Sequence, residues 1–428
     1  MSTREERIRQ EKARRRRKRQ IRLRIRQIVA IALAVLIVIA AITMVVLLVR
    51  LIIPNKKENV QSAATEAPAS STEEESGSLQ LYEGSGNNAS ENEKDSTTEE
   101  SEDGEEADVL APQETDTSSV KKSGSGTGTI TISAAGDCTL GVDENADEST
   151  NFAAMYEEQG YAGYFFENVK SVFEEDDLTI VNLEGTLTTA TEREDKTFAF
   201  KGDPSYVEIL TEGSVEAVNL ANNHSHDYGT QSYEDTISNV EAAGITSFGY
   251  DRTAIQEVNG VKAGLVGIYE LADGIDCKDD LLTNIKKVQS EGADIVIVSF
   301  HWGTEKEYTP NDVQKELAHA AVDAGADLVL GHHPHVLEGI EEYNGKNIVY
   351  SLGNFCFGGN KNPSDKNTMI FQQTFTVKDG QVTQDNVTNI IPCTISSASD
   401  YNDYQPTIAE GDKKQEIEEL ITQYSSEL

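Results

Sequence analysis

The sequence predicts an α/β domain that follows one transmembrane helix and a disordered linker. Three observations lead to this prediction. From Thr129 onward, short runs rich in Ile and Val alternate with amphipathic stretches. Residues 28–49 contain no charged side chain, and residues 54–128 are dominated by Ser, Thr, Glu and Gly. Strands that alternate with helices are typical of an α/β fold.

The N-terminal zone has the pattern of a signal-anchor. Residues 1–27, a basic tail, hold 13 Lys and Arg against three acidic residues. The apolar run that follows is long enough to cross a hydrocarbon core of about 30 Å. It is too long for a cleaved signal peptide, and few buried core helices are apolar all round at this length. We therefore expect a single-pass helix over residues 28–53. Its basic flank predicts a cytoplasmic N-terminus and an extracellular C-terminal domain at the cell membrane.

Residues 54–128 form the predicted linker, an acidic stalk. The segment is rich in Ser, Thr and Glu and has one aromatic residue, Tyr82. A segment with so few apolar side chains cannot offset the entropy cost of ordering, so it is expected to be disordered. Charge repulsion extends such linkers.

The charge balance excludes one class of partner. The chain has a formal net charge of −38, and residues 129–428 hold 17 Lys and Arg against 53 Asp and Glu. A nucleic-acid binder needs a basic face, so we expect no nucleic acid as a partner of the exposed domain. An anionic substrate would be repelled by most of this surface and must be attracted locally.

Residues 129–400 form the predicted folded domain, and residues 401–428 a helical C-terminal tail. Amphipathic spacing indicates helices around Phe165–Phe173 and Val313–Ala324, and a β-hairpin turns at Lys378–Gln381. The predicted strands before the hairpin are Thr129–Ala135, Leu178–Leu183, Val215–Leu220, Val261–Ile268, Ala293–Phe300, Asp327–Leu330 and Asn347–Leu352. The four cysteines are irregularly spaced and favour buried free thiols over a zinc or thioredoxin motif.

Polar side chains collect where these strands end. Six of the seven histidines lie in three short segments of the domain, and His319 lies apart on a predicted helix face that we expect to be exposed. Ligands bind outside the carboxyl ends of strands in open α/β sheets, so the segments should converge. Their carboxylate, carboxamide and imidazole groups suit Mn, Fe or Zn better than Ca. The pattern predicts a site for one or two divalent metal ions.

Six motifs, in order, resemble the bacterial CapA family of capsule-synthesis proteins linked to poly-γ-glutamate. They are Gly136-Asp137, Asn182-Leu183-Glu184-Gly185, Asn222-Asn223-His224 with Asp227-Tyr228-Gly229, His301-Trp302-Gly303 with Glu305, Gly331 with His333-Pro334-His335, and Ser351-Leu352-Gly353-Asn354-Phe355. That family's domain is similar to calcineurin-like metallophosphoesterases. The resemblance implies a four-layer αββα sandwich with two mixed sheets that carry metal ions at one edge.

The resemblance also implies residue roles. Asp137 would bind the first metal ion with His335, and Glu184 would bridge to the second. The second ion would be completed by Asn223, His301 and His333. His224, oriented by Asp227, would be the catalytic acid.

One position departs from the phosphoesterase pattern. Thr139 stands where phosphoesterases usually have a His ligand. The first ion is therefore bound weakly or not at all, or water or His226 completes its set of ligands. Around this core, Lys201 is a candidate substrate contact or a solvated loop lysine, and Glu305 and Asn354 are candidates to orient ligands near the substrate. We interpret His332 as structural and expect Trp302 to pack beneath the site.

Two functions remain open at this stage. The first is a surface-anchored, metal-dependent hydrolase or transferase acting on a phosphoester or a γ-glutamyl polymer, with His224 as the acid. The second is a non-catalytic assembly or export factor that holds nascent polymer beside a membrane polyglutamate synthase complex. An adhesin role would leave the histidine clusters unexplained.

Overall fold

The computed structural model describes residues 124–146 and 151–428. The predicted cytoplasmic tail, the transmembrane helix over 28–53 and nearly all of the stalk lie outside these residues. Among the residues that the structure describes, no helix combines the length and apolar character needed to cross a bilayer.

The larger sheet has eight strands in the order β17-β16-β15-β1-β3-β6-β7, with β14 pairing beside β1. Strands β1, β3, β6 and β7 run parallel to one another, whereas β15 and β16 are antiparallel to their neighbours. The strands are β1 (Gly128–Thr139), β3 (Leu178–Leu183), β6 (Ala217–Asn219), β7 (Thr246–Phe248), β14 (Asn354–Phe357), β15 (Asn367–Lys378), β16 (Gln381–Thr394) and β17 (Thr407–Ile408).

The second sheet has six strands in the order β12-β13-β11-β10-β9-β8, with β9, β10, β11 and β13 parallel. Its strands are β8 (Ala254–Val258), β9 (Val261–Tyr269), β10 (Ile295–His301), β11 (Leu328–His332), β12 (Ile340–Tyr343) and β13 (Lys346–Val349). A small third sheet contains β2 (Val142–Asp143), β5 (Phe200–Gly202) and β4 (Thr186–Leu187).

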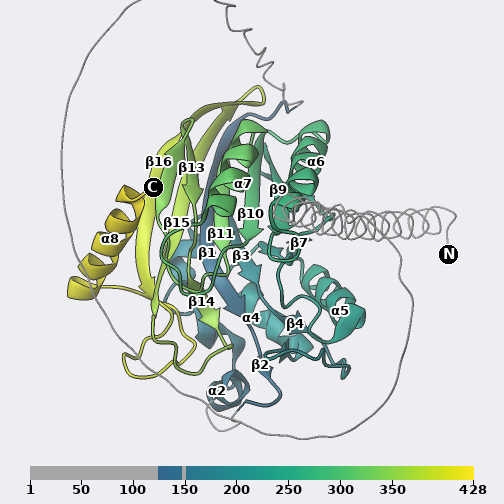
Figure 1. Cartoon of the computed structure of the whole chain (residues 1–428), viewed down its shortest axis with the longest axis vertical. Helices are drawn as coiled ribbons and strands as arrows, with labels where there is room; N and C mark the ends of the chain where they lie inside the picture. Colours follow the sequence, from purple (N-terminus) through teal and green to yellow (C-terminus); the bar gives the residue numbers. More distant parts are fainter. Residues whose placement is uncertain (1–123, 147–150) are drawn as a thin grey trace, which may run out of the picture. The chain divides into compact units, whose positions relative to one another are not determined.

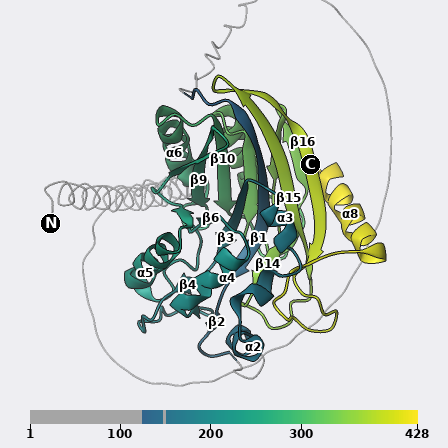
Figure 2. The ribbon, with the colours of Figure 1, turned by 180° about the vertical axis from the view of Figure 1, so that it is seen from behind.

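Most of the helices cover the outer faces of the two large sheets. The α-helices are α2 (Phe152–Gln159), α3 (Lys170–Glu174), α4 (Val207–Glu212), α5 (Gly229–Ala242), α6 (Lys278–Ser290), α7 (Asp312–Asp323) and α8 (Gly411–Ser426). Three short 3-10 turns add η1 (Ala162–Phe166), η2 (Pro204–Tyr206) and η3 (Gly274–Cys277). Figure 1 shows α7 in front of β10 and β11, and the reverse view in Figure 2 shows α3 and α4 in front of the larger sheet.

Three apolar clusters separate these layers. One lies between the two sheets and joins alternate residues of β1 and β3 with alternate residues of β9, β10 and β11. A second packs α2 to α5 on the larger sheet, and a third packs α6 and α7 on the second sheet. Alternation of side chains along each strand explains why one strand feeds two clusters. The order of layers is helices, sheet, sheet, helices.

The α/β prediction is confirmed as a mixed α/β fold with several sheets. The run Leu178–Leu183 is a strand with the predicted bounds, and the hairpin of β15 and β16 turns where expected. The helix expected around Phe165–Phe173 is instead divided into η1 and α3. Helix α8, in the segment predicted as a helical tail, buries Ile417 and Ile421 in the cluster between the sheets.

Candidate metal centre

The polar strand ends of both large sheets meet at one edge of the fold. Asp137 lies near the end of β1, and Glu184 directly follows β3. His301 is the last residue of β10, and His333 follows β11. All four side chains are buried. The predicted convergence of the carboxyl ends is therefore seen in the structure.

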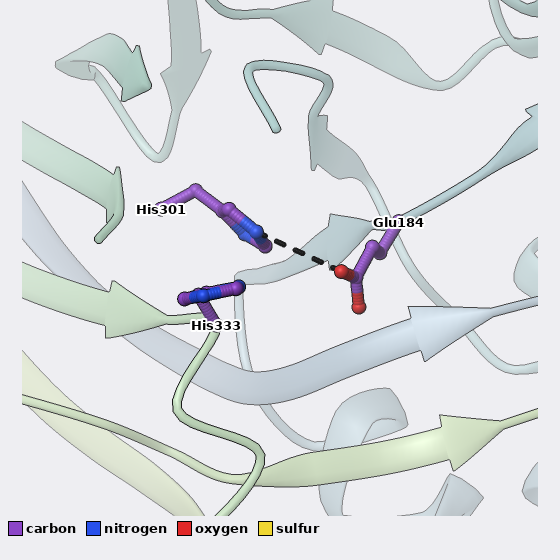
Figure 3. A group of neighbouring side chains, drawn as sticks. All are labelled: Glu184, His301 and His333. Atoms are coloured by element: carbon purple, nitrogen blue, oxygen red, sulfur yellow. Dashed lines mark ion pairs between the residues drawn. The ribbon is translucent and has the colours of Figure 1, made fainter. Parts of the chain in front are cut away.

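Two groups of side chains could each hold a metal ion. Within the described residues, ligand atoms of Glu184, His301 and His333 lie within 4.8 Å of one another, as do those of Asp137, Glu184 and His335. Glu184 belongs to both groups. Figure 3 shows the rings of His301 and His333 beside the Glu184 carboxylate. The structure thus brings together, from both groups, ligands that the resemblance to the CapA family implied.

Glu184 is the centre of this arrangement. Its Oε1 atom lies 3.6 Å from His301 Nε2, 3.9 Å from His224 Nε2 and 4.0 Å from His335 Nε2. His301 Nε2 is also 2.7 Å from the Asn223 side-chain oxygen, the fourth expected donor of the second group. These spacings are compatible with ligands that share an ion at about 2.0–2.2 Å each.

Several buried polar atoms at the centre lack a hydrogen-bond partner within the described chain, which shows whether the residues fit a metal ion. Both carboxylate oxygens of Glu184, Nδ1 of His333 and Oγ1 of Thr139 are buried and have no hydrogen-bond partner in the described part of the chain. Buried polar atoms normally find partners, so these atoms need an explanation. A divalent ion bound by carboxylate and imidazole groups provides it for Glu184 and His333.

The pKa values of three ionisable groups at the centre differ from their ordinary values. Burial raises the pKa of Glu184 to about 8, with repulsion from Asp137 adding to the rise and His335 opposing it. Burial would lower the pKa of His335, but attraction to Glu184 and Asp137 outweighs it and raises that pKa to about 9. Burial would raise the pKa of Asp137, yet contacts with His335 and His332 hold it below its ordinary value.

The remaining histidines of the centre are kept neutral. Burial lowers the pKa of His301 well below its ordinary value, and neighbouring histidines lower it further. Burial also lowers the pKa of His333 and of His332 to about 4. Neutral imidazoles have a lone pair available for a metal ion.

Backbone geometry at the centre is unusual. His333 and His335 have φ angles of 99° and 59°, which are uncommon for residues other than glycine. Such strain persists where the surrounding structure holds it, and it collects at functional sites. Gly136 lets β1 approach its neighbour closely, because a Cβ atom there would lie 2.0 Å from the Gly353 carbonyl oxygen. Asp137 N donates to that same oxygen at 2.9 Å.

His224 lies beside the centre with its predicted partner. Its Nδ1 atom is 2.6 Å from Asp227 Oδ2, and Asp227 also accepts hydrogen bonds from Lys196 Nζ at 2.7 Å and Phe200 N at 2.5 Å. Lys196 Nζ donates to the Asn223 carbonyl oxygen at 2.8 Å as well. Burial lowers the pKa of His224, opposed by Asp227 and reinforced by Lys196.

Of the three candidates around the ligand groups, Asn354 and Glu305 act on the predicted ligands, whereas Lys201 does not contact them. Asn354 supports a predicted ligand, because its Oδ1 atom is 2.9 Å from His335 Nδ1 and its Nδ2 donates to the His335 carbonyl oxygen. Glu305 is exposed, and its charge contributes to the raised pKa values of Glu184 and His335. Lys201 is engaged elsewhere, since its Nζ donates to the Ala190 carbonyl oxygen and lies 4.2 Å from the centre of the Tyr228 ring.

Other expectations can be compared directly. Trp302 is fully buried and stacks on Phe300 in the apolar cluster under α6 and α7. His319 is not the exposed residue that its helical position predicted: it is half-buried, with Nε2 3.0 Å from Glu341 and its ring stacked on Tyr343. His226 is exposed and stacks on Tyr233, and it belongs to neither ligand group. All four cysteines are buried free thiols.

Two residues of the site were given no role from the sequence. Asn182 Nδ2 lies 2.7 Å from Asp137 Oδ1 and 3.1 Å from His301 Nδ1, so this amide joins one ligand of each group. Its position two residues before Glu184 on a strand was an available signal. Lys196 had no such signal, because it lies in a loop 31 residues from Asp227.

Comparisons with known proteins agree on one family. Residues 131–359 match the family described as bacterial capsule synthesis protein PGA_cap. PGA biosynthesis protein CapA of Bacillus subtilis is 35% identical over 221 residues, which are 47% of this chain and 58% of that protein. Capsule biosynthesis protein CapA of Bacillus anthracis is 36% identical over 188 residues, 39% of this chain and 46% of that protein. The chain thus matches about half the length of each relative.

Solved structures give a weaker similarity. The sulfate thiohydrolase SoxB of Thermus thermophilus matches with a TM-score of 0.36 and 13% identity, covering 71% of this chain and 61% of that chain.

Proposed function

Since the chain belongs to the bacterial capsule synthesis protein PGA_cap family, we propose that it is a membrane-anchored, extracellular protein of poly-γ-glutamate synthesis with a metal-dependent hydrolase site. The observation that carries the catalytic proposal is the unpartnered Glu184 carboxylate between two groups of imidazole and carboxylate ligands. This ligand set also supports a metallophosphoesterase-like centre. The anchor rests on the uncharged run over residues 28–49.

The ligands would be shared between two ions. Asp137 and His335 would hold the first ion, His301, His333 and Asn223 the second, and Glu184 both. A divalent ion in such a site supplies a Lewis acid that polarises a phosphoryl or carbonyl oxygen and makes water a nucleophile at neutral pH. Mn, Fe and Zn all suit this mixture of nitrogen and oxygen donors.

His224 would protonate the leaving group. Asp227 fixes its Nδ1 side at 2.6 Å, which leaves Nε2 turned toward Glu184 at 3.9 Å. A protonated His224 can therefore donate from Nε2 to an oxygen or nitrogen that leaves the reacting centre. Lys196 holds Asp227 and the Asn223 backbone together, so it positions an acid and a ligand at once.

The substrate would be a phosphoester or a γ-glutamyl polymer. Both are anionic, and residues 129–428 carry an excess of acidic side chains. Attraction must therefore come from the centre itself, where a bound metal ion would provide positive charge. The expected partner is a membrane polyglutamate synthase complex.

A second candidate is a non-catalytic assembly or export factor that partners a membrane synthase. It is favoured by the first ligand group, in which Thr139 provides no imidazole and only Asp137, Glu184 and His335 remain. A site with fewer protein donors would suit binding of polymer carboxylates as well as chemistry.

Surface polymer separates the two candidates. In producing cells, we expect Asp137→Ala and His301→Ala to reduce surface poly-γ-glutamate as much as deletion of the gene. His319→Gln, which changes a histidine bound to Glu341 instead, serves as the matched control and should preserve the polymer. If deletion abolishes the polymer while both alanine variants produce normal amounts, the assembly role replaces the catalytic one.

A further inference from the structure

His332 occupies a position that the ligand groups leave unexplained. It is the last residue of β11 and is 1% exposed. Neither of its ring nitrogens has a hydrogen-bond partner among the described residues. A buried polar group without a partner is destabilising, so an ordinary packing position would favour an apolar side chain.

The ring lies between the two sheets. Leu328 and Leu330 of the same strand face the cluster between the sheets, and alternation places His332 on that face too. His332 pairs in register with His301 on β10, while its Nδ1 atom lies 3.6 Å from Asp137 Oδ1 on β1. It therefore links the second sheet to a ligand on the first.

The two oxygens of Asp137 have different surroundings. Oδ2 accepts from His333 N at 3.1 Å and lies 3.5 Å from His335 Nδ1, on the side of the ligand groups. Oδ1 accepts from Asn182 Nδ2 at 2.7 Å and faces His332. Since His332 belongs to neither ligand group, its place is behind the ligand and not on the ion.

We propose that His332 is a positioning residue for the first metal ion, donating its Nδ1 proton to Asp137 Oδ1 when the ion binds. The inference rests on the proposed metal centre. A neutral imidazole has one N–H to give, and the 3.6 Å separation must shorten by only about half an ångström to reach hydrogen-bond length. The added donor would orient Asp137 at the site where Thr139 supplies no ligand.

Manganese titration of the metal-free, full-length chain tests this role. Loss of a group behind a ligand costs about 10–100-fold in metal affinity, so we expect that loss for the weaker ion in His332→Leu. His332→Asn places an amide donor near the Nδ1 position and should retain affinity within about threefold of wild type. Ser299→Ala is the matched control, because Ser299 Oγ is another buried atom without a partner in the described chain. It should bind Mn²⁺ like wild type.

Thermal unfolding of the metal-free variants gives an independent measurement. His332→Leu should be as stable as wild type or more stable, because it removes an unpartnered polar group. Lower metal affinity without lower stability would support the positioning role. Equal affinity in His332→Leu and wild type, or equal losses in the Leu and Asn variants, would overturn it. Absence of Mn²⁺ binding to wild type would refute the metal centre itself, and this inference with it.

Discussion

Glu184 Oε1 lies 3.6 Å from His301 Nε2, yet neither oxygen of this buried carboxylate accepts a hydrogen bond from any described residue. Two separate ligand groups meet at this one side chain. A carboxylate in this position is costly without a cation, because a buried charge needs a partner. The relationship between Glu184 and His301 therefore leads directly to predictions about metal binding.

Glu184→Gln should strongly weaken binding of both ions. The variant removes the shared negative charge, so affinity for Mn²⁺ should fall by at least ~100-fold, more than for loss of an outer group. The metal-free variant should be no less stable than wild type, since it removes a buried carboxylate whose oxygens accept no hydrogen bond from a described residue. Calorimetric titration and thermal unfolding measure the two effects. Glu305→Gln removes an exposed acidic charge nearby and should change affinity by no more than about threefold.

Metal binding should depend on pH. In the metal-free chain, burial raises the pKa of Glu184 to about 8, so this group holds a proton at neutral pH. A ligand must lose its proton to bind an ion, and binding therefore releases protons. Affinity for Mn²⁺ should rise as pH increases from about 6 to about 8. Titrations in buffers of different ionisation enthalpy measure the released protons, and affinity independent of pH would contradict the prediction.

Lys196→Met should alter the pH dependence of hydrolysis. Lys196 lies 3.4 Å from His224 Nδ1 and helps to lower the pKa of His224. Without this cation the acid form of His224 persists to higher pH, so the alkaline limb of the rate profile should move upward. The rate itself should fall by about 10-fold, because Asp227 and Asn223 lose an anchor. Lys201→Met is the control, since its ammonium group contacts Ala190 and Tyr228 instead. An unchanged profile in Lys196→Met would refute the positioning role.

Glu338, which belongs to neither ligand group, should make the stability of the fold depend on pH. The residue is fully buried, and burial raises its pKa to about 8 from an ordinary value of 4.5, against the opposing hydrogen bond from Gln314. Between these values the folded chain binds more protons than the unfolded chain, so stability from this group falls as pH rises from about 4.5 through about 8.

Glu338→Gln should remove that loss. Relative to wild type, the variant should gain roughly 1–3 kcal/mol of stability between about pH 5 and pH 9, as expected for a buried carboxyl group whose Oε1 atom has no hydrogen-bond partner among the described residues. Urea unfolding at the two pH values measures the difference. Glu342→Gln, on the nearby strand β12, changes an exposed residue and should follow wild type. A Glu338→Gln variant that loses stability with pH as wild type does would contradict the assignment.

The sequence was most informative where backbone pattern and chemistry coincide. Polar residues after apolar runs placed Asp137, Glu184, His301 and His333 at one edge, because parallel strands bring their carboxyl ends together. Contacts that depend on loop conformation were not accessible in the same way. The path of the loop that brings Lys196 to Asp227 leaves no periodic pattern.

The contacts of two further side chains, Lys201 and His319, could not be predicted from local spacing. Lys201 was a candidate substrate contact or a solvated loop lysine, but its side chain contacts Ala190 and Tyr228. The helical spacing of His319 predicts an exposed side chain, yet its ring contacts Glu341 and Tyr343 of the strand β12. Tertiary contacts decided both cases, and helical or strand spacing does not report them.

The central claim is that this domain is a metal-dependent hydrolase. The most direct measurement is the hydrolysis rate of a phosphodiester and of poly-γ-glutamate by the full-length chain, metal-free and loaded with Mn²⁺. We predict hydrolysis of at least one substrate that requires Mn²⁺ and is lost in His301→Ala. Equal rates with and without metal, or hydrolysis of neither substrate by a chain shown to bind Mn²⁺, would contradict the claim.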